Sequence, residues 1–204
     1  MVRTSTDEEQ IEMLKTFWHE YGKYILIAVV IGLALGYGWQ YWKQRQLTRT
    51  LEASSMYYEI IVPSDKGILS KEQVGVAKRM ISHYPQTPYA SIASFILAKQ
   101  QVSLKKYKEA IPYLTWVVSH SHVNSFKQLA RIRKARIEVY LKQPRQALAT
   151  LKKTDDVGFM PMVQQMRADA YMAQGKRDQA NALYTKAKAG YEALGIVNTA
   201  LSLQ

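Results

Sequence analysis

A run of nineteen residues without a charged side chain, from Tyr24 to Trp42, limits what this chain can fold into. Lys23 and Lys43 flank the run, and Gln40 is its one clearly polar side chain. At about 1.5 Å per residue it would make about 28 Å of helix, close to the roughly 30 Å hydrocarbon core of a bilayer. Aromatic rings gather at both ends, as in the belts found at membrane interfaces. The run therefore predicts a transmembrane anchor over residues 24–42; the alternative is a buried core helix.

This anchor is predicted to stay uncleaved. Its apolar run is longer than the roughly 7–15 residues of a signal-peptide core, and bulky rings stand where a small-residue cleavage site would lie. The chain has no cysteine, so we expect no disulfide, no thiolate chemistry and no tether through an acylated cysteine. The helix itself must therefore hold the protein to a membrane.

The sequence divides into a segment at 1–23, the anchor at 24–42 and a helical domain at 43–204. Charge is unequally shared, because residues 1–42 carry three basic and five acidic residues and the rest carries 25 basic and 11 acidic ones. The basic domain is expected to favour anionic neighbours such as lipid headgroups or acidic proteins. The first segment has apolar residues at helical spacing, so it predicts either an amphipathic helix in the membrane interface or a short stub. Gly22 is expected to end or bend that helix.

Charge alone leaves the topology open. Two basic residues lie close before the run, at Lys15 and Lys23, and three lie close after it, at Lys43, Arg45 and Arg49. Since basic residues favour the cytoplasmic side, the margin of one residue leans toward a cytoplasmic C-terminal domain.

Small residues inside the anchor predict a packing face. Gly32 and Gly36 form a GxxxG pair, with Ala28 one turn earlier. Such faces let membrane helices approach each other closely. The alternative is that these glycines are incidental, because glycine is common in membrane spans.

Beyond the anchor the pattern is helical, and turn residues separate its parts. The segment 63–67 reads as a turn, Ser70 as the start of a helix with Gln73 completing a capping box, and the two prolines in 84–88 as its stop. The first soluble helix is expected to continue directly from the anchor.

The remainder repeats itself in three windows that start 37 and 33 residues apart. Each window has a turn in its middle and two alanines twelve positions apart, namely Ala98 and Ala110, Ala135 and Ala147, and Ala168 and Ala180. This resembles the tetratricopeptide repeat, a helix–turn–helix of about 34 residues. The sequence thus predicts an all-α fold, in which an N-terminal transmembrane helix precedes a tetratricopeptide-repeat-like α-solenoid of helical hairpins.

The repeat resemblance implies a groove lined by the first helix of each hairpin. Positions just beyond the first alanine of each window are the candidates for protein binding: Lys99, Val102, Arg136, Tyr140, Asp169 and Met172. A solvated face with scattered apolar contacts is the alternative for each of them.

The N-terminal part resembles a particular family. Gln10-Ile-Glu12, Phe17-Trp18 and Gly22-Lys23, followed by a glycine-containing span ending at Trp42, are similar to the YfgM-like ancillary SecYEG translocon subunits. The resemblance implies an inner-membrane protein with one span, a cytoplasmic N-terminus and a periplasmic repeat domain, against the charge margin. It also implies partners: the SecYEG translocon, a membrane-anchored periplasmic chaperone, and newly exported client proteins.

Signals for catalysis are weak. His120 and His122 would point apart on a helix, and no phosphate loop or nucleophile elbow is present. Asp155 and Asp156 read as a loop and helix-cap pair rather than a catalytic dyad. We therefore predict no enzyme, no metal and no cofactor.

Basic residues crowd one helical face, at Lys127, Arg131 and Lys134. This face is either simply solvated or contacts anionic lipid or an acidic partner; nucleic acid is not expected, because no aromatic platform accompanies the charge. Two functions remain: a scaffold at the Sec translocon, or a cytoplasmic-facing adaptor or assembly factor unrelated to secretion.

Overall fold

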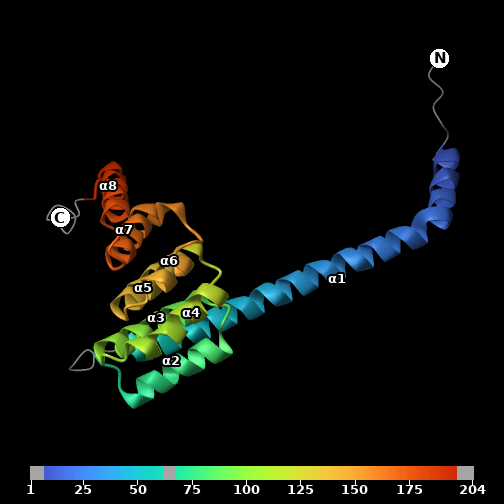
Figure 1. Ribbon diagram of the computed structural model, residues 1–204. Helices are drawn as coiled ribbons and strands as arrows, with labels where there is room; N and C mark the ends of the chain where they lie inside the picture. The colour runs from blue at the N-terminus through green and yellow to red at the C-terminus, as the bar shows by residue number, and fades with distance from the viewer. Residues whose placement is uncertain (1–6, 62–67, 197–204) are drawn as a thin grey trace. The chain divides into compact units, whose positions relative to one another are not determined.

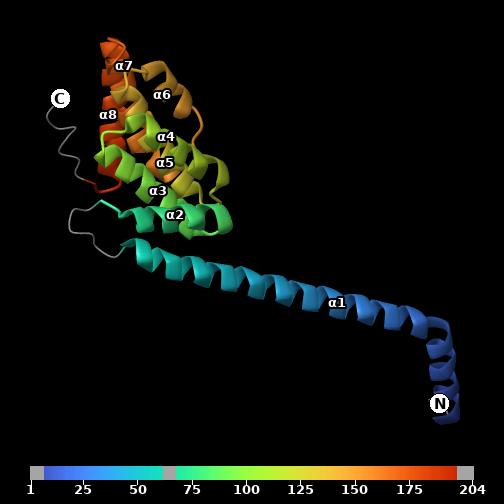
Figure 2. The ribbon, with the colours of Figure 1, turned by 90° about the horizontal axis from the view of Figure 1, so that it is seen from below.

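A computed structural model of the chain describes residues 7–61 and 68–196. The predicted turn at 63–67 lies outside the described residues. The chain separates into two compact units, Met1–Thr48 and Arg49–Gln204. All regular elements in the described part are helices (Figures 1 and 2).

Helix α1 runs from Asp7 to Ile61. Most of it belongs to the first unit, and its last turns belong to the second unit. The helix does not end at Gly22: the ring of Trp18 covers this glycine, and a Cβ added there would lie 3.4 Å from the ring atoms. Figures 1 and 2 show α1 bending near its N-terminal end. The predicted continuation of the anchor into the first soluble helix is confirmed by the unbroken bounds of α1.

The predicted anchor lies within α1, and its large apolar side chains are exposed all round the helix, Leu33 by 69% and Leu35 by 70%. Within the described residues, α1 is the helix that is long and apolar enough to cross a membrane. A helix that is apolar on every face needs an apolar environment, and the first unit supplies none. The alternative of a buried core helix is therefore wrong for this segment.

The second unit is a stack of helical hairpins. After α2 (Lys71–His83) come α3 (Pro88–Ser103) with α4 (Tyr107–His120), α5 (Asn124–Tyr140) with α6 (Pro144–Thr150), the short 3₁₀ helix η1 (Val157–Phe159), and α7 (Met160–Met172) with α8 (Arg177–Ala193). Each hairpin corresponds to one predicted window, and neighbouring hairpins pack on each other in chain order. The predicted all-α hairpin repeat is thus confirmed.

The start and stop signals around α2 lie where expected. Ser70 accepts a hydrogen bond from the Gln73 backbone, and the Gln73 side chain accepts one from the Ser70 backbone, so the capping box is complete. The helix ends at His83, and α3 begins at Pro88 after an N-cap at Thr87. A proline in the first helical position suits this start because its missing N–H would have no partner there.

The three hairpin turns share one backbone motif. Lys105, Lys142 and Gly175 each adopt a left-handed conformation, with φ of 59°, 61° and 75°. In each case the next residue donates its N–H to the carbonyl five residues back, at 2.8, 2.8 and 3.0 Å. This is the Schellman ending of a helix, which satisfies carbonyls that the last turn leaves free. The left-handed residue lies seven positions after the first alanine of every window, so the repeat register holds in the turns.

The six repeat alanines are buried, each with at most 3% of its surface exposed. Ala98 and Ala110 lie in one apolar cluster, and Ala135 and Ala147 in another. Small side chains at these points leave room for the helices of a hairpin to approach each other closely.

A further hairpin precedes the three predicted ones. Ala53 and Ile60, in the last turns of α1, form one apolar cluster with Ala77 and Met80 of α2 and Leu97 of α3. The end of α1 therefore forms the first helix of this further hairpin, and α2 forms the second. The repeat pattern did not predict this hairpin.

Candidate functional site

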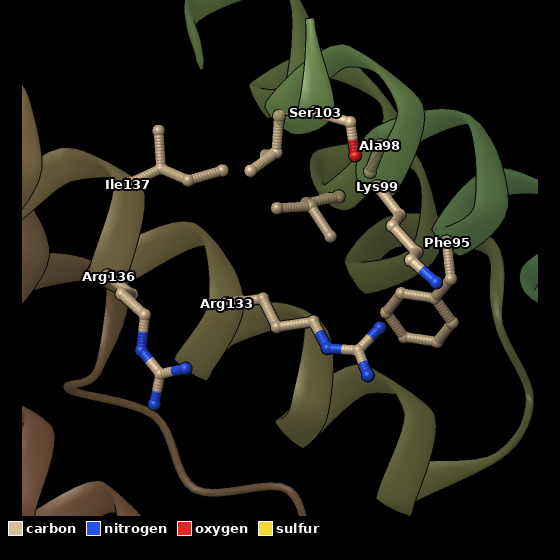
Figure 3. A pocket seen from close by; sticks show the side chains of 9 residues that line it. Phe95, Ala98, Lys99, Ser103, Arg133, Arg136 and Ile137 are labelled. Atoms are coloured by element: carbon tan, nitrogen blue, oxygen red, sulfur yellow. The ribbon is translucent and has the colours of Figure 1, made fainter. Parts of the chain in front are cut away.

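A cavity of about 440 Å³ opens between the first helices of two successive hairpins, α3 and α5. Figure 3 shows the side chains that surround it. Its lining residues are Phe95, Ala98, Lys99, Val102, Ser103, Leu114, Arg133, Arg136 and Ile137. This volume is within the range of roughly 300–1,000 Å³ that is typical of ligand pockets.

Helical spacing explains how the sequence builds this cavity. Along α3 the lining residues recur every three or four positions, from Phe95 through Lys99 to Val102. Residues at that spacing share one helix face, and the same holds for Arg133 and Ile137 on α5. The two faces meet across the groove, while Leu114 of α4 lies at the base of the cavity, with only 1% of its surface exposed. The result is an apolar floor with polar side chains around it.

The electrostatics of the cavity are one-sided. Lys99, Arg133 and Arg136 line it, and none of the lining residues that the structure describes is acidic. The Arg133 guanidinium lies over the Phe95 ring, 4.8 Å from its centroid, which is a cation–π contact. Burial lowers the pKa of Arg133 from its ordinary value, and the neighbouring charge of Arg136 lowers it further. An anion at this place would favour the charged form of Arg133 and so oppose this lowering of its pKa.

The structure brings half of the predicted groove residues together at this cavity: Lys99, Val102 and Arg136. Tyr140 lies outside the cavity and packs against Tyr107, with ring centroids 4.3 Å apart. A hydrogen bond between these two tyrosines, and to a smaller degree burial, raises the pKa of Tyr107.

The groove candidates of the third hairpin lie apart from the cavity. Asp169 accepts a hydrogen bond from the Tyr184 hydroxyl at 2.7 Å, which ties α7 to α8. Met172 is 40% exposed. Of the three hairpins, the first two therefore supply the cavity.

The residues of the predicted basic patch differ in how far they are neutralised. The Arg131 Nε lies 2.6 Å from Asp155 Oδ2, and the Lys134 Nζ lies 3.3 Å from a carboxylate oxygen of the fully buried Glu138. Lys127 is half-buried, with no carboxylate partner among the residues described. Two of the three charges are thus engaged inside the domain.

Asp155 and Asp156 hold the loop before α7 in place. Partial burial acts to raise the pKa of Asp155, but hydrogen bonds and charge from Arg131 and Lys153 outweigh it and leave the pKa below its ordinary value. Asp156 accepts hydrogen bonds from Ser125 and from the Gly158 backbone, which lower its pKa, and it caps η1. Both carboxylates serve structure, in line with the predicted loop and cap pair.

The two neighbouring histidines also have separate surroundings. His120 stacks on Trp116, with ring centroids 4.7 Å apart, and its Nδ1 bonds to the Trp116 carbonyl. His122 contacts Gln86. Across the described ranges, no three His, Asp or Glu residues cluster in a way that could hold a metal ion.

In the first unit, the predicted packing face is open. Ala28, Gly32 and Gly36 are exposed, and no atom lies within 4 Å of a Cβ added at either glycine. The space beside this face could be taken by another helix.

Sequence reasoning missed several residues of the cavity, among them Phe95 and Arg133. A signal for Phe95 was present, because it precedes Ala98 by three positions and so shares its helix face. Arg133 lies within the basic stretch, but the pattern assigned that charge to the face of Lys127, Arg131 and Lys134. Only the position of α3 beside α5 shows that Arg133 points to the groove.

Comparisons with known proteins place the chain in a family. A family model described as a tetratricopeptide repeat-like domain matches residues 15–203. The chain is 26% identical to the ancillary SecYEG translocon subunit of Escherichia coli (strain K12), over 87% of this chain and 85% of that protein. It is 25% identical to the protein of the same name from Aggregatibacter actinomycetemcomitans, over 95% and 94% of the two chains. The protein of that name from Neisseria gonorrhoeae is 26% identical, over 89% and 87%.

No solved structure matches the chain. The similarity to translocon subunits confirms the resemblance that the N-terminal residues predict. The match over residues 15–203 includes both the apolar run and the three hairpins, so the chain belongs to the tetratricopeptide repeat-like domain family.

Proposed function

We propose that this protein is a membrane-anchored interaction scaffold that associates with the Sec translocon. The observation that carries the proposal is the cavity between α3 and α5, whose described lining combines apolar side chains with three cations and contains no carboxylate, histidine or cysteine. Such a surface suits the binding of a protein segment rather than a reaction. The names of the relatives, which are translocon subunits, give the membrane partner.

The proposal assigns different tasks to the two units. The span at 24–42 docks on the translocon through the Ala28, Gly32 and Gly36 face, because close helix approach needs small residues and lipid offers no apolar drive for association. The hairpins recruit a membrane-anchored periplasmic chaperone and exported clients. This requires a cytoplasmic N-terminus and a periplasmic C-terminal domain in the cell inner membrane. No nucleic acid and no cofactor takes part.

Affinity purification from detergent-solubilised membranes tests the docking face. A tagged full-length chain is expected to co-purify with SecY. Gly36→Ile should reduce the recovered SecY, because the added side chain keeps a partner helix at a distance. Gly38→Ile is the matched control, since Gly38 is equally open but lies on another face of the helix. Equal recovery with both variants would show that this face does not dock.

A reporter at the C-terminus tests the topology and separates the two functions. Alkaline phosphatase fused after Gln204 is active only outside the cytoplasm, so we expect an active fusion. An inactive phosphatase together with a fluorescent fusion at the same position would favour the alternative, an adaptor or assembly factor with a cytoplasmic domain and no link to secretion.

A further inference from the structure

The cavity between α3 and α5 has a composition that selects among ligands. Its apolar lining includes Leu114, Ile137 and Val102, and Leu114 is almost fully buried. Val102 is 37% exposed, so a fully hydrated anion alone would leave apolar surface uncovered. A ligand that fills the cavity must therefore bring an apolar group, because burial of apolar surface is what such a floor stabilises.

The cations around this floor have no acidic partner. Lys99, Arg133 and Arg136 form no ion pair within the part of the chain that the structure describes, in contrast to Arg131 and Lys134 of the same region. Of these, the Arg133 guanidinium lies over the Phe95 ring, 4.8 Å from its centroid, while Lys99 lines the same cavity from α3 (Figure 3). Like charges that line one cavity without an acidic partner are stabilised by a bound anion.

The third cation extends the charge along the groove. Arg136 lies one turn after Arg133 on α5, and in Figure 3 its guanidinium projects away from the Phe95 ring. A ligand with several carboxylates along an extended backbone can contact each of these cations, and the guanidinium groups suit it because they pair with carboxylates in a two-pronged geometry.

We infer that the cavity between α3 and α5 binds an extended acidic peptide segment, with one large apolar side chain on the Leu114 floor and flanking carboxylates on Lys99, Arg133 and Arg136. This deepens the scaffold function proposed above and rests on it. It names the chemistry of the protein segment that the hairpins recruit: acidic residues next to an apolar one.

The test uses the full-length chain in neutral detergent micelles and a dye-labelled peptide with a central Leu between three acidic residues on each side. The peptide is acetylated and amidated, so that only side-chain carboxylates contribute. Fluorescence polarisation is expected to show saturable binding that weakens with added salt, because exposed charge pairs are screened. Replacing the acidic residues by their amides, or the central Leu by Ser, should each weaken binding about tenfold or more.

Protein variants locate the binding site. Lys99→Gln and Arg136→Gln should each weaken binding about tenfold, since each removes a charge-assisted hydrogen bond. Both side chains are exposed, so folding should be unaffected. Lys108→Gln and Lys188→Gln are matched controls, because they remove the same charge from exposed positions outside the cavity, and they should leave binding unchanged. Arg136→Lys keeps the charge but loses the two-pronged pairing, so it should weaken binding less than Arg136→Gln does.

Three outcomes would overturn the inference: binding that ignores Lys99→Gln and Arg136→Gln, equal weakening by the control variants, or equal binding of the amide peptide. Binding of the chain to phosphatidylglycerol vesicles that depends on the same two residues, without peptide binding, would instead assign the cavity to a lipid surface and would also refute it. The recovery of SecY with the full chain is measured in parallel. Recovered SecY with no peptide binding refutes this inference alone, whereas loss of SecY refutes the scaffold function.

Discussion

Gly190 is a position where a substitution that normally stabilises a helix should destabilise this protein. It lies inside α8, and a glycine in a helix interior is less favourable than alanine by about 0.8–1.0 kcal/mol. Gly190→Ala would therefore be expected to raise stability if only the helix mattered. The packing of α8 against α7 reverses this expectation, because a Cβ added at Gly190 would lie 2.7 Å from Cγ and 3.2 Å from Cβ of Pro161.

The magnitude follows from what can move. Carbon atoms prefer separations of about 3.5–4.0 Å, so the new methyl group overlaps the proline ring by nearly 1 Å. Pro161 is buried in the first turn of α7, and its ring cannot rotate away as a flexible side chain would. Overpacking of this kind costs about 1–3 kcal/mol, and here the upper part of that range applies. After the gain in helix propensity, Gly190→Ala should lower the free energy of unfolding by about 1–2 kcal/mol.

Gly75→Ala is the matched control for this prediction. Gly75 lies inside α2, where an added Cβ meets only the end of the Arg79 side chain at 3.8 Å, which is an ordinary contact. This variant should gain about 1 kcal/mol, so the two variants should differ by about 2–3 kcal/mol. Urea unfolding of the full chain in mild detergent, followed by circular dichroism at the helix band, measures both. If Gly190→Ala stabilises the protein as much as Gly75→Ala does, α7 and α8 do not approach each other as described.

Three further predictions follow from the hairpins. Ala147→Leu should lower the free energy of unfolding by about 1–3 kcal/mol because Ala147 is fully buried, whereas Ala149→Leu, at an exposed position of the same helix, should change little in the same urea assay. Gly175→Ala should destabilise the protein by more than about 0.4–1 kcal/mol and so lower its thermal midpoint, because the φ of 75° is strained for alanine. Gly175→Asn should be tolerated better, and equal midpoints for the two variants would contradict the turn geometry. Asp155→Asn should destabilise by about 1.5–3 kcal/mol at neutral pH. The folded-state pKa of Asp155 is lowered from 3.8, so its contribution to stability is present above that pH and is lost as the pH falls below it. The stabilities of the wild type and of Asp155→Asn should therefore converge in acid unfolding. A stability difference that stays constant with pH would refute the ion pair.

Much of the fold is readable from local patterns. The apolar run, the capping residues at Ser70 and Gln73, and the alanine pairs each lie within a short stretch of the chain, so a single sequence displays them. The hairpin turns are a partial exception. Gly175 indicates a left-handed residue from its type alone. Lys105 and Lys142 adopt the same conformation without such a signal in the sequence, and the Schellman hydrogen bonds offset the strain.

Contacts between distant residues explain what the sequence did not reveal. The basic patch was predicted from the helical spacing of Arg131 and Lys134, but Asp155 lies twenty-four residues after Arg131 and neutralises it only because α6 and the loop after it turn the chain back. The cavity also depends on a contact between distant residues, because Phe95 and Arg133 come from two different hairpins. Helical spacing in the sequence indicates which face of a helix a side chain lies on. Only the packing of the hairpins determines which residues that face contacts.

The last turns of α1 have a consequence for how this protein could be trimmed or turned over. Ala53 and Ile60 are core residues, so a protease that removed everything up to residue 61 would leave Met80 and Leu97 without their cover. Release of the hairpins from a membrane by a cut near α2 would thus expose an apolar edge and mark the fragment for degradation. A cut before residue 49 would spare this core. The position of a cleavage would therefore decide whether a stable fragment or no fragment accumulates.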